Sequence, residues 1–298
     1  MNETSDDKAL IAFAGMGVMG APMAGHLARA GHSVRVYNRS PQKALDWASA
    51  HTGTVADTLA ALAEGASVLV LCVGNDDDVR QIVTEALPHL APGAVIIDHT
   101  TTSAAVAREL AGLAATTGRV FLDAPVSGGQ AGAVNGALSV MIGGDEAMVD
   151  RVRPLLSAYA KAVAYMGPSG SGQLTKMANQ IAIAGVVQGL AEAMHFTRSA
   201  GLDPAAVYAA ISKGAAQSWQ MDNRWATMAE DRYDFGFAVD WMRKDLGLVL
   251  DEARHNGAHL GLTALVDQFY SEVQAMGGSR WDTSSLAARL EARRRNQD

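Results

Sequence analysis

A lysine and two amides share one face of a predicted helix. Lys176, Asn179 and Gln180 lie at positions i, i+3 and i+4, which are neighbours on an α-helix. A lysine can donate a proton to a developing alkoxide or remove one from an alcohol, while an amide holds the hydroxyl. This combination favours carbonyl chemistry. From these residues alone, a surface lysine beside two surface amides is an equally good interpretation.

A second set of residues has the spacing of a phosphate-binding turn. Gly15, Gly17 and Gly20 form Gly-x-Gly-x-x-Gly directly after an apolar run, residues 9–13, and before a helix-like stretch. Such glycines permit a tight turn, a close approach to a pyrophosphate, and close packing of helix on strand. The alternative is a strand–turn–helix corner without a ligand. The residues expected to bind a dinucleotide are Gly15, Met16, Gly17, Val18, Met19 and Gly20.

The residues after the second predicted strand bear on the choice of cofactor. In dinucleotide-binding folds, an acid there hydrogen-bonds the adenosine ribose and so disfavours a 2′-phosphate. This chain has Asn38, Arg39 and Ser40 instead, and arginine presents a planar set of donors that suits a phosphate. We therefore expect NADP(H) to be preferred, with NAD(H) possible. If Arg39 is only an exposed loop residue, either cofactor binds.

The elements that must position these residues alternate along the first half of the chain. Continuous apolar runs such as residues 67–73 indicate strands buried on both faces, and helix-like segments separate them. This alternation predicts a Rossmann-type α/β fold with a doubly wound, mostly parallel sheet. Its ligand edge is at the carboxyl ends of the strands.

The pattern changes at the glycine-rich segment 167–172. From there to about Ser199 the residues favour one long helix, and its apolar middle, residues 181–187, is expected to be buried. After Gly201 the chain is predicted to be helical to its end. We expect a flexible tail at 1–8, a dinucleotide-binding domain at 9–168, a long interdomain helix at 169–200, and a helical substrate and dimerisation domain at 201–298.

Composition restricts the classes of function. The chain has 298 residues and a net charge of −7, which argues against a general nucleic-acid binder. A single cysteine, Cys72, excludes an internal disulfide and a multi-cysteine zinc site; we expect no metal. No apolar run is long enough to predict a membrane span. These features favour a cytoplasmic protein that binds neither nucleic acid nor membrane.

Four motifs in this chain resemble those of the β-hydroxyacid dehydrogenase family, which includes 3-hydroxyisobutyrate dehydrogenase and tartronate semialdehyde reductase. The resemblance covers roughly residues 10–288. The motifs are GMGVMGAPM at 15–23, DAPVSGG at 123–129, Gly-x-x-Gly-x-Gly-x-x-x-Lys at 167–176, and KDL at 244–246.

The resemblance implies a role for the lysine and the two amides of the long helix. Lys176 would be the general acid/base, and Asn179 or Gln180 would orient the substrate oxygen. Family members often carry asparagine four residues after the catalytic lysine, where this chain has Gln180. Which of the two amides, Asn179 or Gln180, orients the substrate oxygen therefore stays open.

Further implied roles concern substrate and cofactor. Ser127 and the backbone N–H groups of Gly128 and Gly129 would hold a substrate carboxylate. Lys244 would approach the nicotinamide end, where it could contact both substrate and cofactor. The remaining residues implied at the cofactor are Val73, through its backbone, and Thr101, near the nicotinamide ribose.

The segment after the strand at 67–73 departs from the family pattern. Members often have Leu-Pro there, whereas this chain has Val73-Gly74 followed by three acids, Asp76, Asp77 and Asp78. We expect these acids to point away from the phosphates, as residues at a helix N-terminus.

The resulting expectation is an NADP(H)-dependent enzyme that interconverts a small β-hydroxyacid and its semialdehyde or keto acid. Alternatives are an imine reductase-like activity, and a non-catalytic dinucleotide-binding interaction protein on the same fold. We expect a small carboxylate-bearing substrate and a homodimer or homotetramer. Residues that fall where a substrate wall, a core or a subunit interface could form are Trp219, Asn223, Arg224, Phe235 and Phe237.

Overall fold

A computed structural model describes residues 9–295, with side chains as far as Ala292. The predicted tail at 1–8 lies outside the described residues. The chain divides into two compact units, the first ending at Lys176 and the second beginning at Met177.

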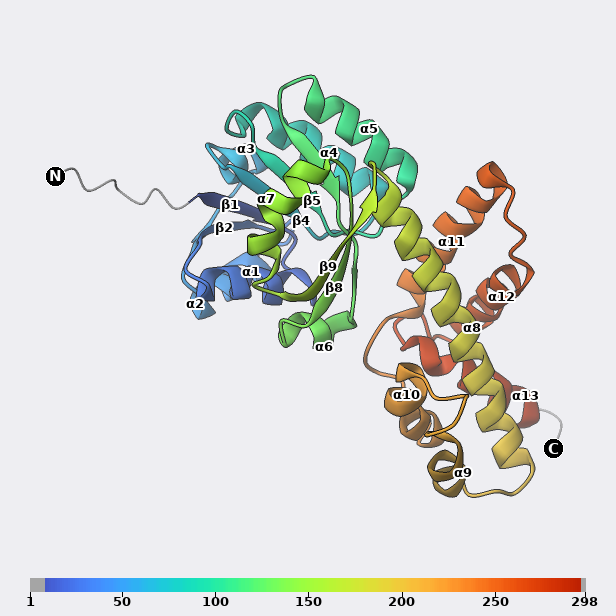
Figure 1. The fold of residues 1–298 in the computed structure, drawn as a ribbon. Coiled ribbons are helices and arrows are strands. Elements are labelled where there is room, and N and C mark those ends of the chain that lie inside the picture. Colours follow the sequence, from blue (N-terminus) through green and yellow to red (C-terminus); the bar gives the residue numbers. More distant parts are fainter. Residues whose placement is uncertain (1–8, 296–298) are drawn as a thin grey trace. The chain divides into compact units, whose positions relative to one another are not determined.

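The first unit is built on a sheet of nine strands (Figure 1). The strand order is β3-β2-β1-β4-β5-β6-β8-β7, with β9 beside β8. All pairs from β3 to β6 are parallel. The strands are β1 (Leu10–Ala14), β2 (Ser33–Tyr37), β3 (Thr54–Val55), β4 (Val68–Leu71), β5 (Val95–Asp98), β6 (Val120–Asp123), β7 (Val126–Ser127), β8 (Leu138–Gly143) and β9 (Ala160–Gly167).

Helices separate most consecutive strands, as the alternating pattern predicts, whereas β7 follows β6 directly. Those of the first unit are α1 (Gly20–Arg29), α2 (Pro41–Ala50), α3 (Leu59–Ala63), α4 (Asp76–Ala86), the short η1 (Leu87–His89), α5 (Ala104–Ala115), α6 (Gly129–Val134) and α7 (Glu146–Leu156).

Two hydrophobic clusters lie on opposite faces of this sheet. Ile11 and Phe13 of β1 belong to one cluster, Ala12 and Ala14 to the other, because successive side chains of a strand point to opposite faces. Helices α1, α2 and α7 contribute to the first cluster and α3, α4 and α5 to the second. Helices therefore cover both faces, and the predicted Rossmann-type fold is confirmed.

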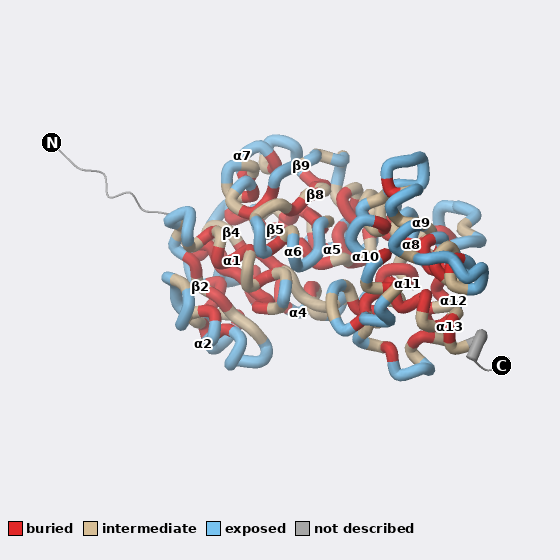
Figure 2. The backbone as a smooth tube through the Cα atoms, turned by 90° about the horizontal axis from the view of Figure 1, so that it is seen from below, coloured by how far each residue is buried: buried red, intermediate tan, exposed pale blue. Residues whose placement is uncertain are grey.

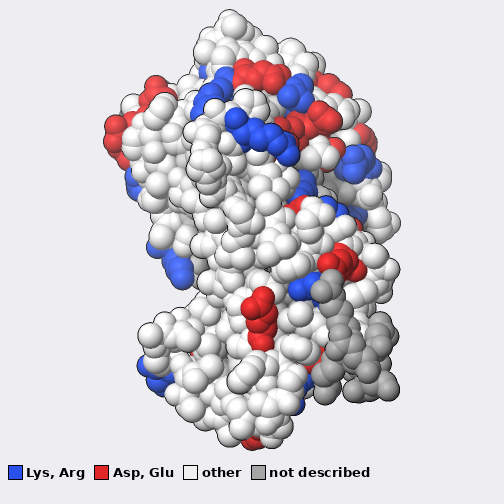
Figure 3. All heavy atoms as spheres, turned by 90° about the vertical axis from the view of Figure 1, so that its right-hand side faces the viewer, with Lys and Arg blue, Asp and Glu red and all other residues white. Residues whose placement is uncertain are grey.

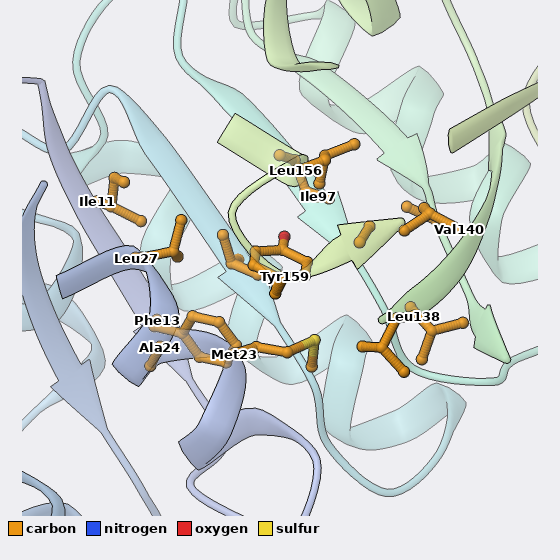
Figure 4. Close-up of a cluster of buried hydrophobic side chains, with 14 of the residues drawn as sticks. Ile11, Phe13, Met23, Ala24, Leu27, Ile97, Leu138, Val140, Leu156 and Tyr159 are labelled. Carbon is orange, nitrogen blue, oxygen red and sulfur yellow. The ribbon is translucent and has the colours of Figure 1, made fainter. Parts of the chain in front are cut away.

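Tyr159 lies within the first cluster, near Phe13, Met23 and Leu138 (Figure 4). It is fully buried, and its hydroxyl is 2.8 Å from Nε2 of His99. A polar contact is thus enclosed in the apolar interior.

The far end of the sheet is not parallel throughout. Strand β8 runs antiparallel to β6 and β7 and parallel to β9. The order β8, α7, β9 continues the alternation of strands and helices, but the two-residue β7 and the short α6 were not expected. Segments of that length have no hydrophobic period that could reveal them.

The second unit is helical around a core of its own. Helix α8 (Ser171–Ser199) begins in the first unit and continues into the second. Its buried side chains, including Ala184, Val187 and Met194, pack with residues of α10, α11, α12 and α13. In Figure 2 the inward faces of these helices are buried and their outward faces exposed. The other helices are α9 (Pro204–Ile211), α10 (Trp219–Ala229), α11 (Val239–Asn256), α12 (Gly261–Ala275), the short η2 (Thr283–Ser285) and α13 (Leu286–Arg295).

Within residues 9–295, no helix combines the length and the apolar character needed to cross a membrane. On the face in Figure 3, acidic and basic side chains are interspersed. The predicted cytoplasmic location stays a prediction.

Candidate functional site

The glycine turn lies between β1 and α1, and two of its glycines are needed by the fold itself. Gly15 has φ of +103°, and a Cβ there would lie 2.1 Å from the carbonyl oxygen of Cys72. A Cβ on Gly20 would lie 1.9 Å from the carbonyl oxygen of Gly15. Since such contacts are far inside van der Waals distance, both positions require glycine for the packing of the turn on its neighbours.

Gly17 differs from its two neighbours in the motif. A Cβ on Gly17 would meet no heavy atom within 4 Å, so the protein's own packing does not call for glycine there. No side chain caps the N-terminus of α1, and its first turn carries no acid. The free space at Gly17 and the uncapped N-terminus of α1 together suit the binding of a pyrophosphate close to the backbone.

The loop after β2 supports the same turn. The side-chain oxygen of Asn38 accepts the N–H of Met16 at 2.9 Å, and its amide nitrogen donates to the carbonyl of Ser40 at 3.0 Å. Both ends of the Asn38 side chain therefore hold backbone in place. The side chain of Arg39 is 86% exposed and lies 3.2 Å from a carboxylate oxygen of Asp78.

A hollow of about 200 Å³ lies at the end of β2. That volume suits part of a ligand rather than a whole dinucleotide. Its lining residues are Tyr37, Asn38, Arg39, Pro41, Ala44, Leu45, Val55, Ala56 and Asp57.

The loops after β4 and β5 are joined by a hydrogen bond. The backbone N–H of Val73 donates to the hydroxyl of Thr100 at 3.0 Å. Thr101, next along the chain, is half-buried. Because the carboxyl ends of neighbouring parallel strands share one edge of the sheet, Val73 and Thr101 lie on the same edge as the glycine turn.

The segment predicted to hold a carboxylate joins β7 to α6. Ser127 ends β7 and is half-buried. Gly128 and Gly129 have φ of +131° and +60°, and no side chain caps α6. The segment thus presents a hydroxyl followed by a helix start without a side-chain partner, an arrangement that can accept an anion.

Asp123, at the end of β6, holds the start of helix α8. Its two carboxylate oxygens accept the backbone N–H groups of Gly170 at 2.8 Å and Gln173 at 3.0 Å. Burial raises the pKa of this carboxyl, and the two N–H groups oppose that shift. A carboxylate at this point satisfies helix N–H groups that would otherwise lack partners.

Gln173 ties the same helix to the loop after β5. Its amide nitrogen donates to the carbonyl of Thr100 at 2.8 Å, and its side-chain oxygen accepts the N–H of Thr102 at 3.0 Å. Gln173 is fully buried, and Lys176, three residues further on, is 8% exposed. The interpretation of Lys176 as an ordinary surface lysine is therefore wrong.

Three further candidates, Asn179, Gln180 and Lys244, lie in a network of the second unit. Asn179 donates to the side-chain oxygen of Gln180 at 2.8 Å, and Gln180 donates to Asp245 at 2.7 Å. The ammonium of Lys244 is 3.1 Å from the other oxygen of Asp245. Gln180 and Asp245 are each 2% exposed, so Gln180 uses both ends of its amide inside the protein.

His99 is a structural residue. Its Nδ1 is 2.6 Å from the carbonyl of Ala124 and its Nε2 is 2.8 Å from the hydroxyl of Tyr159. Burial lowers the pKa of His99 to about 4, so the ring is neutral at physiological pH. A neutral ring with both nitrogens engaged is suited to packing rather than to proton transfer.

The three acids at the start of α4 do not behave alike. Asp76 accepts the N–H of Ser103, and Asp77 pairs with Arg80 at 2.9 Å. Asp78 pairs with Arg39. The expectation that the three acids point away from the phosphates stays a prediction, although Asp78 pairs with a residue predicted to bind the cofactor.

The suggested substrate-wall residues meet within the second unit. The guanidinium of Arg224 lies 5.1 Å from the ring centre of Trp219 and 5.0 Å from that of Phe235, and 3.0 Å from Asp282. The backbone N–H of Phe237 donates to the same Asp282. Arg224 is thus fully engaged by this unit.

Sequence reasoning missed three residues that organise the site. Asp123 and Gln173 lie inside recognised motifs, where the glycines and the lysine drew attention. A carboxylate ending a buried strand at the ligand edge was the available signal for Asp123. Asp245 also lies inside a recognised motif, KDL at 244–246, where Lys244 drew the attention. Among the described residues, no group of three or more His, Cys, Asp or Glu is placed to hold a metal.

Two family models match this chain, one over each of its two parts. Residues 10–167 match the family model described as the NAD-binding domain of 6-phosphogluconate dehydrogenase. Residues 170–290 match the family model described as 'NAD-binding of NADP-dependent 3-hydroxyisobutyrate dehydrogenase'.

Individual relatives are similar along nearly their whole length. An uncharacterized oxidoreductase of Shewanella frigidimarina is 61% identical over 96% of this chain and 99% of its own. The 2-hydroxy-3-oxopropionate reductase of Escherichia coli is 33% identical over 94% and 97%. The structure of Mycobacterium tuberculosis 3-hydroxyisobutyrate dehydrogenase with L-serine superposes with a TM-score of 0.86, at 32% identity, covering 95% and 99% of the two chains.

The fold, the glycine turn and these matches define an NAD(P)-dependent oxidoreductase that acts on CH–OH groups. More particularly, the chain belongs to the β-hydroxyacid dehydrogenase family. The predicted resemblance is confirmed, whereas the roles of individual site residues stay predictions.

Proposed function

We propose that the protein interconverts a small β-hydroxyacid and its semialdehyde or keto acid, with Lys176 as the general acid/base. The observation that carries the proposal is the setting of Lys176. It is almost fully buried, one helical turn after Gln173 and the Asp123-bound start of α8. The nicotinamide, when bound, supplies or accepts the hydride. Lys176 gives a proton to the carbonyl oxygen in reduction and takes it back in oxidation.

The substrate carboxylate is assigned to the segment from Ser127 to Gly129. A hydroxyl and the N–H groups of an uncapped helix start can together stabilise a carboxylate. The relatives support this class of substrate: one is named for 2-hydroxy-3-oxopropionate, and another structure contains L-serine. Both compounds are small acids.

Of the two amides, we assign the substrate contact to Asn179. Gln180 accepts from Asn179 and donates to Asp245, so both ends of its side chain are used. Gln180 then positions Asn179 through one hydrogen bond. Through its other hydrogen bond it holds Asp245, which in turn positions Lys244. Lys244 lies at the nicotinamide end in this proposal.

NADP(H) is the proposed preferred cofactor, with NAD(H) also used. Arg39 is exposed and lines the hollow at the end of β2, where a 2′-phosphate is expected. The description of the matching family model as NADP-dependent supports this assignment.

The decisive test is Lys176→Ala, assayed by NADPH consumption with a panel of small semialdehydes. We expect kcat to fall by about 10²–10⁴-fold, the usual contribution of a general acid/base, while the Kd of NADPH stays within about twofold, a change well under 1.4 kcal/mol. Lys161→Ala, at an exposed lysine of β9, is the matched control. Unchanged turnover in Lys176→Ala would remove the proposed role.

The same assay separates the alternatives. Tight NADPH binding without turnover of any semialdehyde would favour the binding-protein alternative, and reduction of a cyclic imine alone would favour imine chemistry.

We further propose a homodimer or homotetramer. Large apolar side chains are exposed on the second unit, among them Val186, Phe196, Leu262 and Leu265, with exposures of 39–69%. Apolar surface of this kind is typical of subunit contacts. Light scattering coupled to size exclusion measures the mass, and a monomer at micromolar concentration would contradict the proposal.

A further inference from the structure

The chain lacks an acid at the end of β2, yet a carboxylate lies beside that loop. It comes from Asp78 in the first turn of α4, a helix that follows another strand. An oxygen of Asp78 is 3.2 Å from Nη1 of Arg39, and the Asp78 side chain is 24% exposed. Tertiary structure thus brings an acid to a place where the local sequence has none.

The orientation of Asp78 is set by its surroundings. The side-chain oxygen of Asn75 caps α4 by accepting the N–H of Asp78 at 2.9 Å. The neighbouring acids are engaged elsewhere, Asp76 with Ser103 and Asp77 with Arg80.

A carboxylate in this place acts differently on the two cofactors. A 2′-phosphate bound to Arg39 would have to displace Asp78 or stay a few ångströms from it, and like charges that close repel even through water. A ribose with a free 2′-hydroxyl carries no such charge, and a nearby carboxylate can accept its hydrogen bond.

We propose that Asp78 is a specificity-determining residue that opposes the 2′-phosphate and keeps the enzyme able to use NAD(H) beside NADP(H). This inference rests on the proposed contact between Arg39 and the 2′-phosphate. Asp57 also lines the hollow, but the acid that pairs with Arg39 is Asp78. Asp78 competes for the same guanidinium, so the selectivity of the protein reflects a balance between Arg39 and Asp78.

The test is the Asp78→Asn variant of the full chain, with the Kd of NADP⁺ and of NAD⁺ measured by isothermal titration calorimetry. These ligands differ only in the 2′-phosphate. Removing the carboxylate should tighten NADP⁺ binding about tenfold, equivalent to about 1.4 kcal/mol. The Kd of NAD⁺ should stay the same or rise slightly. Because the repulsion is between charges near solvent, the tenfold gain should shrink as salt increases.

Asp77→Asn is the matched control, since it makes the same change of charge one residue away on a side chain paired with Arg80. Both Kd values should change by less than about twofold in this control, that is by under about 0.4 kcal/mol. If NADP⁺ bound more tightly by the same factor in both variants, the effect would come from the net charge of the protein and the inference would be overturned.

Arg39→Ala separates this inference from the proposed function. If Arg39→Ala weakens NADP⁺ selectively but Asp78→Asn leaves the ratio of the two Kd values unchanged, the role of Arg39 stands and that of Asp78 is refuted. If Arg39→Ala leaves the ratio unchanged, the NADP(H) assignment fails and the inference fails with it. Thermal melts of each variant verify that the fold is retained.

Discussion

Alanine substitutions at two glycines of the same turn should have opposite consequences. In Gly15→Ala, the new Cβ would lie 2.1 Å from a carbonyl oxygen on a backbone with φ of +103°. A non-glycine residue at positive φ costs about 1–3 kcal/mol, and the backbone shift that relieves the contact adds to it. We expect a loss of at least about 3 kcal/mol in the free energy of unfolding, or roughly 6 °C or more in Tm.

Gly17→Ala should leave the unliganded protein intact. The Cβ would meet nothing within 4 Å and the backbone is not at positive φ. Replacing glycine by alanine at a compatible position stabilises by about 0.4–1 kcal/mol, so Tm should stay the same or rise. The methyl group would, however, stand where the pyrophosphate must approach.

The cost to cofactor binding follows from overpacking. Forcing one extra methyl group into a close contact costs about 1–3 kcal/mol, which corresponds to about a 5- to 150-fold rise in Kd. Fluorescence titration with NADPH and a thermal melt on the same sample measure both effects. A Kd within twofold of wild type in Gly17→Ala would refute the reasoning that the pyrophosphate passes this residue. A stable Gly15→Ala protein would refute the packing argument.

Three further outcomes are expected. Gln173→Met leaves the buried carbonyl of Thr100 and the N–H of Thr102 without partners, so urea denaturation should show a loss of about 2–5 kcal/mol; a loss below about 1 kcal/mol would contradict the contact. In Asp123→Asn one side-chain oxygen can still accept a hydrogen bond, but the new NH₂ group faces a backbone N–H of the helix. The free energy of unfolding in urea should therefore fall by about 1–3 kcal/mol, and an unchanged denaturation midpoint would contradict this. Burial lowers the pKa of His99 to about 4 from its ordinary value of 6.5, so as pH falls from 6.5 toward 4 the unfolded chain takes up a proton that the folded chain does not. Stability should fall across this window by up to about 3 kcal/mol, and an unchanged pH dependence in His99→Gln would contradict this.

Local patterns in the sequence were sufficient to predict the fold. The buried strands, the helices between them and the glycine turn each depend on residues close together in the chain. The long helix predicted at 169–200 is observed as α8, Ser171–Ser199. The antiparallel pairing of β8 depends instead on a two-residue strand, which is too short for a periodic signal.

The candidate site was predictable in its types of residue but not in their partners. Asp123 and Gln173 are 50 residues apart along the chain, and Arg39 and Asp78 are 39 apart. Hydrogen bonds over such separations depend on the order of strands in the sheet, which a single sequence does not specify. For this reason the sequence left Gln180 as a candidate to orient the substrate oxygen, whereas in the structure both ends of its amide are hydrogen-bonded inside the protein.

The two hydrogen bonds of Gln173 have a consequence for how this family can diversify. Lys176 is the last residue of the first unit, and Gln173 and Asp123 fasten its helix to the strands that carry the cofactor loops. The proposed proton donor therefore belongs to the same compact unit as the predicted cofactor loops. The helical second unit begins at Met177 and contributes the proposed residues Asn179 and Lys244. Substitutions elsewhere in that unit can therefore alter substrate binding while Lys176 and its anchors stay in place.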